Sequence, residues 1–390
     1  MVSGEDATLV YLDHAATTPV RPEVVDVMVE VMRGVTGNPS GAHGPARRAR
    51  DVVEEARERI AELVGVTPGE VVLCSGGTEA DDLAVTGAVR RRGGTAVCTS
   101  VEHPAVLEAV QALGGVVAPV DGAGVVDLDR LADSFDGSTS LVSVMTVNNE
   151  VGVVQPVADV AALVREVAPD ALVHTDAVQA APWLDLRELV RVVDLMTVSA
   201  HKLGGPQGVG CLIVRDGVVL EPRQRGGGQE RDRRSGTHHV AGIAGMAVAM
   251  ASAAATRTME AARVAAMRDR LLDGLLAAVP GLVVPGAAAR DRGALAPHLA
   301  TVAVPGAASE ELLYLLDRAG IAASAGSACS SGAQQVPHTL AAMGVEPAVA
   351  GGAVRFSLGH TSTDADVDRV LDAFPRIVAH LRGATAAAVG

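Results

Sequence analysis

The chain has 390 residues, a net charge of −14 and a hydrophobic content of 48%, with aromatic residues at only 2%. This length and hydrophobicity exclude a disordered chain and indicate a globular protein with a large core. With so few aromatic residues, the core must be built from Val, Leu, Ala and Ile. The acidic balance argues against nucleic acid as a main partner, because phosphate contacts need clustered Lys and Arg.

Targeting and metal signals are missing from the sequence. The N-terminus is acidic and lacks a basic start followed by an apolar run, so we expect no signal peptide. The longest uncharged apolar run, residues 240–255, is too short to span a bilayer and predicts a buried helix. Cys74, Cys98, Cys211 and Cys329 are widely spaced without metal-like His/Cys pairing, so no metal site is expected. We expect a reducing, cytoplasmic location and no membrane partner.

Short Val-rich runs alternate with longer helical patterns over the first two thirds of the chain. We expect strands at residues 71–75, 96–100, 141–147, 171–176, 195–199 and 209–214, and helices at about 78–91, 104–113 and 157–167. Buried strands that alternate with helices favour a mostly parallel sheet covered on both faces. After about residue 255, a long helical stretch leads into short strands and helices that favour a smaller α+β domain.

Five of the predicted strands end in polar clusters. The clusters are SGGTE (75–79), SVEHP (100–104), VNNE (147–150), HTDAVQ (174–179) and SAHK (199–202). In open α/β sheets, ligands bind beyond the carboxyl ends of the strands. We therefore expect all five clusters to converge on one crevice.

Lys202, in the last of these clusters, is the only lysine in the chain, and every other basic residue is an arginine. A lysine amine can lose its proton and attack a carbonyl to form a Schiff base, whereas a guanidinium stays protonated. A solvated surface lysine is the alternative interpretation. In a chain that uses arginine for surface charge, a lone lysine at a polar strand end favours covalent attachment of a cofactor.

A lysine-bound cofactor that acts as an electron sink is pyridoxal 5'-phosphate (PLP), which needs a carboxylate at its pyridine nitrogen. Asp176 ends a predicted strand upstream of Lys202 and is the candidate, with a helix N-cap as its alternative role. Gln179, one turn further on, is placed to reach the ring hydroxyl. His103, at a strand-to-helix junction, is either a structural histidine or a group that stacks on the ring and moves protons.

The cofactor phosphate needs an anion site, and the SGGTE cluster predicts one. Glycines such as Gly77 permit a tight turn, the free N–H groups of the first helical turn face the anion, and the Thr78 hydroxyl adds a donor. Ser199 and His201 flank Lys202 and supply further donors. An ordinary turn is the alternative for this cluster alone.

Together these motifs resemble those of the cysteine desulfurases, the NifS/IscS-like group of PLP-dependent enzymes in the class V aminotransferase family. The resemblance covers nearly the whole chain and rests on YLDHAATTPV, GNPSGAHGPAR, SGGTEADDLA, SVEHPAVL, VNNEVGVVQPV, HTDAVQ, SAHKLGGPQGVG, GGGQERDRRSGT, GSACSSG and VRFSLG. It implies the PLP-dependent transferase fold type I, an α/β fold with a mostly parallel seven-stranded sheet. Residues 15–256 would form the large PLP-binding domain, and 1–14 with 257–390 the small domain carrying the catalytic cysteine loop.

The resemblance also implies a role for each matching position. Lys202 would carry the cofactor and remove the α-proton, and Asp176 would pair with the pyridine nitrogen. Gln179 would pair with the ring oxygen, and His103 would stack on the ring as acid/base. The phosphate would be held by Gly77, Thr78, Ser199 and His201, joined by Thr237 from the second subunit of a homodimer. Asn149 would contact the cofactor and, with Arg355, hold the substrate carboxylate.

Cys329 lies in a small, polar, loop-like stretch and is the nucleophile that the resemblance implies. The enzyme would convert L-cysteine to L-alanine and transfer the sulfur to Cys329 as a persulfide. An acceptor protein would then take the sulfur for iron–sulfur cluster assembly, or for tRNA or other thiolation. A selenocysteine lyase and a non-catalytic sulfur-transfer scaffold remain as alternatives, although a scaffold has no need of Lys202, Asp176, His103 and Cys329 together.

Overall fold

A seven-stranded sheet forms the centre of the computed structural model, which describes residues 9–291, 293–325 and 336–389. Its strands, in the spatial order β2-β8-β7-β6-β5-β3-β4, are β2 (Val71–Cys74), β3 (Thr95–Thr99), β4 (Val116–Ala118), β5 (Thr139–Ser143), β6 (Leu172–Asp176), β7 (Leu195–Ser199) and β8 (Gly210–Val214). β8 runs antiparallel to both of its neighbours, and the other pairs are parallel. The predicted α/β class with a mostly parallel seven-stranded sheet is therefore confirmed.

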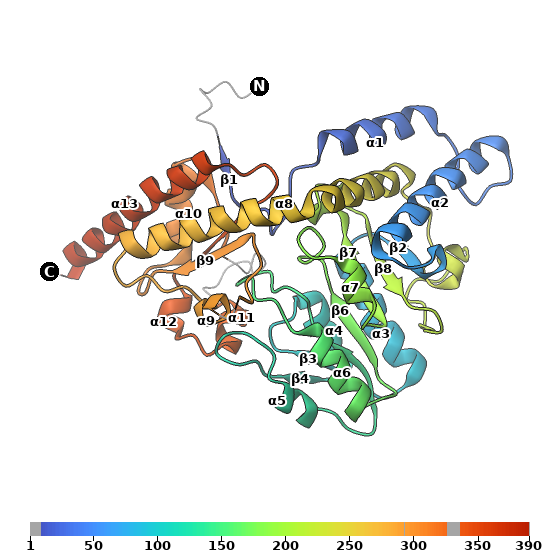
Figure 1. Ribbon diagram of the computed structural model, residues 1–390, viewed down its shortest axis with the longest axis horizontal. Helices are drawn as coiled ribbons and strands as arrows, with labels where there is room; N and C mark the ends of the chain where they lie inside the picture. The colour runs from blue at the N-terminus through green and yellow to red at the C-terminus, as the bar shows by residue number, and fades with distance from the viewer. Residues whose placement is uncertain (1–8, 292, 326–335, 390) are drawn as a thin grey trace.

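Helices cover both faces of this sheet (Figure 1). On one face lie α3 (Gly77–Arg92) and α4 (Pro104–Ala112), and on the other α2 (Gly44–Val64), α5 (Leu128–Asp133), α6 (Val157–Val167) and α7 (Leu186–Val190). Alternate strand residues serve the two layers: Val71 and Leu73 pack into one core, and Val72 and Cys74 into the other. This alternation explains why the strands appear in the sequence as continuous Val-rich runs.

One strand prediction extends too far. The ladder of β5 stops at Ser143, although we expected a strand up to residue 147. The main-chain N–H groups of Val144 and Thr146 still donate to the carbonyls of His174 and Asp176 (3.0 and 2.9 Å), so the chain follows β6 while it turns. This turn delivers the VNNE cluster to the end of the sheet.

Helix α8 (Val240–Ala278) runs as one rod across the molecule, next to α1 (Pro22–Gly34) and α2 (Figure 1). Its first half packs into the core beneath the sheet through Ile243 and Met246, and its second half packs into a separate core through Val264 and Leu271. By length and composition α8 is apolar enough to cross a membrane, but 56% of the qualifying window is buried, as expected of a core helix. The helix passes through the predicted domain boundary at residue 256.

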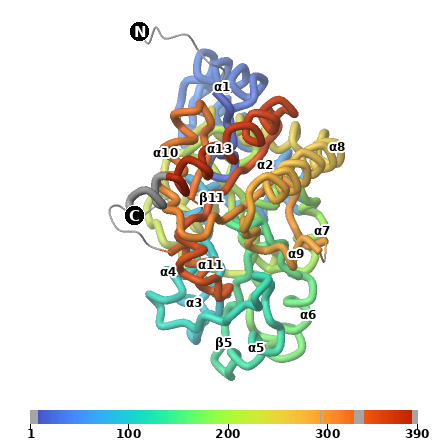
Figure 2. The backbone as a smooth tube through the Cα atoms, turned by 90° about the vertical axis from the view of Figure 1, so that its left-hand side faces the viewer, coloured from blue at the N-terminus to red at the C-terminus, as the bar shows by residue number. Residues whose placement is uncertain are grey.

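The C-terminal elements form a second, smaller packing unit. Strand β9 (Leu299–Ala303) pairs antiparallel with β11 (Ala353–Ser357), and β1 (Val10–Tyr11) pairs parallel with β10 (Ile321–Ala322). Figures 1 and 2 show α10 (Ser309–Arg318) and α13 (Asp364–Val389) beside these strands. The remaining short helices are η1 (Pro68–Glu70), η2 (Ala200–Lys202), η3 (Gln229–Asp232), α9 (Ala287–Asp291), α11 (His338–Ala342) and α12 (Pro347–Ala350). Because β1 belongs to this unit, residues 12–18 must cross from it to the large sheet.

Candidate active site

A cavity of about 450 Å³ lies at the carboxyl ends of the sheet strands. All five polar clusters that we expected to converge contribute to its wall, which confirms that prediction. The predicted site residues that line it are Gly77, Thr78, His103, Asn149, Asp176, Gln179, Ser199, His201, Lys202 and Arg355.

Lys202 ends the short helix η2 that follows β7, and its amine points at the crossing segment. The Nζ atom donates to the carbonyl oxygens of Ala15 and Ala16 at 2.5 and 2.6 Å. Burial lowers the pKa of this amine to about 8, with a further lowering from Arg355 and an opposing effect from Asp176. A useful fraction of the amine is therefore neutral near physiological pH, as a nucleophile requires.

Asp176 is the last residue of β6 and is 6% exposed. One carboxylate oxygen, Oδ1, accepts a hydrogen bond from the N–H of Val178 at 2.8 Å, so the residue does stabilise the following turn. Burial raises the pKa of Asp176, while His103 and Lys202 lower it. A protonated pyridine nitrogen beside this carboxyl would provide the cationic partner that a buried carboxylate needs.

Two side chains flank the space between these groups. Gln179 donates from Nε2 to the carbonyl of Ala15 (2.8 Å), and its Oε1 lies 3.1 Å from Nε2 of His298. His103 caps α4, because its Nδ1 accepts from the N–H of Ala105 at 3.2 Å. Burial lowers the pKa of His103, so the ring is neutral near pH 7 and carries its proton on Nε2.

Anion-binding groups gather at the start of α3. Gly77 opens this helix, and a Cβ there would lie 3.1 Å from Val178, so the chain approaches closely at this point. The hydroxyl of Ser199 is buried and has no hydrogen-bond partner among the described residues. An unsatisfied buried hydroxyl costs about 1–3 kcal/mol, which a bound phosphate would recover. Burial also lowers the pKa of His201 to about 4, leaving a neutral ring 3.2 Å from the Thr17 hydroxyl.

Arg355 reaches the cavity from β11 of the second packing unit and is 2% exposed. Its Nη1 donates to the carbonyl of Asn149 at 2.8 Å, and its Nη2 pairs with Oδ1 of Asp13 at 2.9 Å. These two contacts fix the orientation of the guanidinium beside Lys202. A fixed, buried guanidinium suits recognition of a substrate carboxylate.

The two remaining predicted site residues are Thr237 and Cys329. Thr237 is exposed, between η3 and α8, and does not line the cavity. Cys329 lies outside the described residues. Cys74, Cys98 and Cys211 are buried free thiols, and burial raises the pKa of each, to about 12 for Cys211. Such buried thiols with raised pKa values are inert.

Several groups at the cavity were not predicted. Glu150 lines the cavity and stands inside the cluster VNNE, so the motif could have pointed to it. Asp81, 1% exposed, lines the wall with Oδ1 3.7 Å from Nε2 of His174. His338 also lines it, but no motif signalled that residue. Among the described residues, no cluster of His, Cys, Asp and Glu is arranged to hold a metal ion.

A sheet of this topology with a buried lysine amine, a buried carboxylate and an anion site at its strand ends defines a PLP-dependent enzyme of fold type I. Residues 10–370 match the family model described as aminotransferase class-V. An "IscS-like cysteine desulfurase" of Mycobacterium tuberculosis is 42% identical, over 98% of this chain and 99% of the relative.

Comparison with solved structures points to the same family. A "NifS-like protein" superimposes with a TM-score of 0.87 at 36% identity, covering 96% of this chain and 100% of the other. "SspA in complex with cysteine" superimposes with a TM-score of 0.76 at 29% identity, covering 89% and 98%. The chain therefore belongs to the class-V aminotransferase family, within its IscS- and NifS-like cysteine desulfurase group, and depends on PLP.

Proposed function

We propose that this protein is a cysteine desulfurase that converts L-cysteine to L-alanine and passes the sulfur to Cys329 as a persulfide. The observation that carries the proposal is the joint position of Lys202, Asp176 and Arg355 on one cavity, together with the low pKa of the lysine amine. The related SspA structure, which contains cysteine, supports the choice of substrate.

PLP, when bound, supplies an electron sink that acidifies the Cα–H bond of a bound amino acid. In our proposal Asp176 keeps the proton on the pyridine nitrogen, and Gln179 donates to the ring oxygen with the amide hydrogen that Ala15 does not use. Gly77, Thr78, Ser199 and His201 hold the phosphate. The burial of Asp176 and the buried, unpaired hydroxyl of Ser199 support these assignments.

Other residues of the cavity bind the substrate and transfer protons. Arg355 and Asn149 hold the substrate carboxylate, and Asp13 keeps the guanidinium in place. Lys202, once released from the carbonyls of Ala15 and Ala16, removes the Cα proton. His103 stacks on the ring and serves as acid/base through Nε2, because its Nδ1 is engaged by the main chain.

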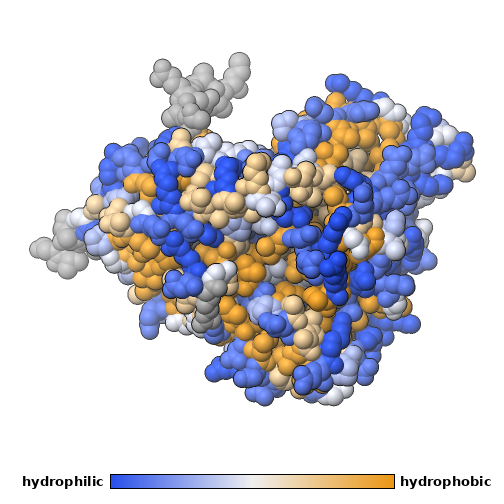
Figure 3. Space-filling view, in the orientation of Figure 1, coloured by the Kyte–Doolittle hydropathy of each residue, from blue (hydrophilic) through white to orange (hydrophobic). Residues whose placement is uncertain are grey.

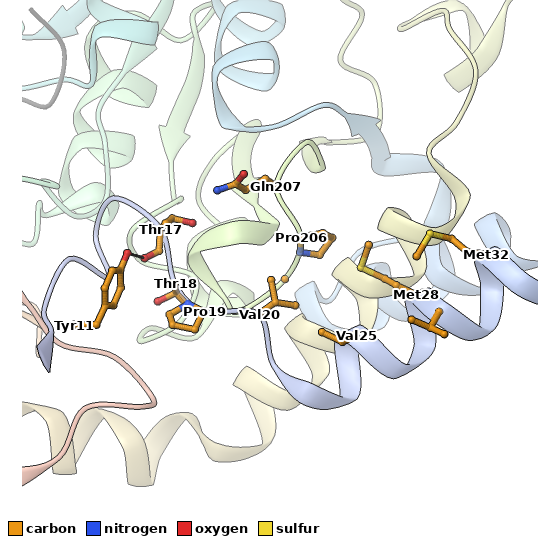
Figure 4. Close-up of a pocket in the computed structure, with 12 residues that line it drawn as sticks. Tyr11, Thr17, Thr18, Pro19, Val20, Val25, Met28, Met32, Pro206 and Gln207 are labelled. Carbon is orange, nitrogen blue, oxygen red and sulfur yellow. Dashed lines mark hydrogen bonds between the residues drawn. The ribbon is translucent and has the colours of Figure 1, made fainter. Parts of the chain in front are cut away.

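We also propose that the protein is a homodimer in which Thr237 completes the phosphate site of the second subunit. An apolar groove of about 530 Å³ between α1 and residues 205–207 supports this arrangement (Figure 4). Figure 3 shows apolar side chains around α1, where Val25 and Met32 are 46% and 60% exposed. Thr17 lines the groove and also contacts His201, so the groove adjoins the cofactor cavity.

The destination of the sulfur is an acceptor protein of the reducing cytoplasm, serving iron–sulfur cluster assembly or thiolation of tRNA or other molecules. A comparison of L-cysteine and L-selenocysteine turnover by the holoenzyme tests the proposed reaction. We expect alanine from L-cysteine, with sulfur retained as protein persulfide when no reductant is present. Negligible alanine from L-cysteine and rapid turnover of L-selenocysteine would instead identify a selenocysteine lyase.

A further inference from the structure

A histidine and a glutamate form a pair on the cavity wall that the proposed reaction has not yet used. His338 begins α11, and Glu150 ends the VNNE cluster. The imidazole Nδ1 lies 3.5 Å from Oε1 of Glu150, and its Nε2 lies 2.9 Å from the main-chain oxygen of Glu102. The His338 side chain is 31% exposed and that of Glu150 only 4%, so the pair joins a buried carboxyl to an accessible ring.

Hydrogen-bond chemistry fixes where the protons of this pair lie. A main-chain carbonyl only accepts, so Nε2 of His338 must carry a hydrogen to bond to Glu102. In a neutral ring Nδ1 is then an acceptor, and it faces a carboxylate that also only accepts. The contact is favourable only when one further proton lies on Nδ1 or on Glu150. The two side chains therefore hold one exchangeable proton between them.

Burial of the carboxyl fits this description. Burial raises the pKa of Glu150, and the charges of His338 and Arg355 lower it again. The charged and titratable groups that face the pair are Arg355 from β11 and His103 from the start of α4. The proton can thus move between ring and carboxyl without leaving an uncompensated buried charge.

The proposed reaction requires one such proton carrier. As the sulfur leaves, the Cβ–S bond breaks with its electron pair on Cβ, and Cβ takes up one proton to become the methyl group of alanine. The attacking thiol forms the S–S bond and loses its S–H proton. The attacking and the transferred sulfur are each oxidised by one electron and Cβ is reduced by two, so no outside oxidant is needed. One proton must travel from the attacking thiol to Cβ.

We propose that the His338–Glu150 pair carries this proton, taking it on Nδ1 of His338 and returning it to Cβ of the substrate. This inference rests on the proposed cysteine desulfurase reaction. In the proposed reaction Lys202 removes the Cα proton, and His103 stacks on the cofactor ring and exchanges protons through Nε2, since its Nδ1 accepts from the N–H of Ala105. The pair lies on the same cavity wall as Asn149 and Arg355, where the substrate carboxylate binds.

The test compares a reaction that involves a thiol with one that does not, using the holoenzyme. One readout is the single-turnover formation of alanine from L-cysteine as a function of pH. The other is exchange of the Cα hydrogen of L-alanine in D₂O, which needs the cofactor and Lys202 but no sulfur. His338→Gln keeps a donor for the Glu102 carbonyl but cannot carry a proton, and Glu150→Gln removes the second member without changing its size.

Each variant should slow alanine formation from L-cysteine by about a hundredfold, the usual size of general acid–base catalysis, and remove one ionisation from the pH profile. Exchange of L-alanine should change by less than about twofold. The double variant should be no slower than either single one, because the two residues act as a unit. The exposed His380 of α13 gives a matched control, and His380→Gln should change neither reaction.

An equal loss of both reactions in His338→Gln would show a merely structural role and overturn the proposal, as would unchanged turnover of L-cysteine. The wild-type arm reports separately on the proposed function. A wild-type holoenzyme that exchanges the L-alanine hydrogen but forms no alanine from L-cysteine would refute the desulfurase reaction itself.

Discussion

Lys202 donates a 2.5 Å hydrogen bond from its amine to the main-chain carbonyl of Ala15. The crossing segment that contains Ala15 therefore holds the one lysine of the chain in a defined position inside the cavity. Burial at this position lowers the pKa of the amine to about 8. This hydrogen bond must break when the amine bonds to PLP. Only the neutral amine is a nucleophile, so attachment of PLP depends on the protonation state of Lys202.

The rate of covalent PLP attachment to cofactor-free protein should rise with pH. The neutral amine is the nucleophile, so the rate should rise about tenfold per pH unit below pH 8 and level off above it. Stopped-flow absorbance of the yellow Schiff base measures this dependence. Asp13 raises the pKa of Lys202, so Asp13→Asn should move the midpoint to lower pH.

Lys202 is the only lysine of the chain, so its substitution removes every side-chain amine that could bind PLP covalently. Lys202→Arg should bind PLP without a covalent bond and lose activity by roughly a thousandfold or more. Borohydride reduction followed by peptide mass mapping should label Lys202 in the wild type and no side chain in Lys202→Arg. In the pH dependence of PLP attachment to the wild-type protein, a midpoint near the ordinary lysine pKa of 10.5 would contradict the effect of burial on Lys202.

The strand-end clusters were predictable because each lies within a few residues of a strand that its own sequence specifies. Asp13 and His338 were not, because β1 and α11 approach the sheet only through the packing of the second unit. Helix α8 was also misjudged as two stretches. Its residues change near position 255 from uniformly apolar to amphipathic because the helix leaves the buried core there, and no break in the backbone accompanies that change.

Removal of the Glu230 carboxylate should destabilise the protein strongly. Glu230 forms two hydrogen bonds of 2.7 Å with Arg57, accepts from the N–H of Leu73 and contacts His238. It also begins a run of three left-handed residues, with φ of 51°, 56° and 63°, that precedes Thr237. Glu230→Ala leaves the buried Arg57 with only the half-exposed Glu54 as a carboxylate partner and should cost about 3–5 kcal/mol in denaturant unfolding.

The pH dependence of stability gives a second measurement of this ion pair. Its contacts lower the pKa of Glu230 from the usual 4.5 to about 2, so the stabilisation is complete above pH 4.5 and is lost as the pH falls toward 2. Glu230→Ala should lack that component. The exposed pair Arg191–Glu188 is the control, and Glu188→Ala should change stability by less than about 1 kcal/mol. An equally small effect of Glu230→Ala would refute the prediction.

Cys329→Ser should separate sulfur transfer from cofactor chemistry. The variant should bind PLP normally and still exchange the Cα hydrogen of L-alanine, but form no persulfide. Persulfide can be located by alkylation and mass spectrometry of tryptic peptides. Cys74, Cys98 and Cys211 should carry none in either protein, because burial raises the pKa of all three thiols. A persulfide on one of them would reassign the nucleophile.

Met32→Glu should weaken the proposed dimer. The methionine side chain is 60% exposed beside the apolar groove, and a buried carboxylate at a subunit interface is costly. Sedimentation velocity should show a larger monomer fraction, and PLP should dissociate more readily because Thr237 of the second subunit is lost. Exposed Tyr314, on α10 away from the groove, supplies the control variant Tyr314→Glu, which should remain dimeric. A monomeric wild type would exclude this arrangement.

The most direct measurement is a single turnover of wild-type holoenzyme with L-cysteine in the absence of reductant. Alanine is quantified per active site, and the protein is analysed by mass spectrometry for added sulfur. We expect one alanine per active site and one sulfur atom gained on Cys329. Pyruvate in place of alanine, or alanine without any sulfur on the protein, would contradict the proposed reaction.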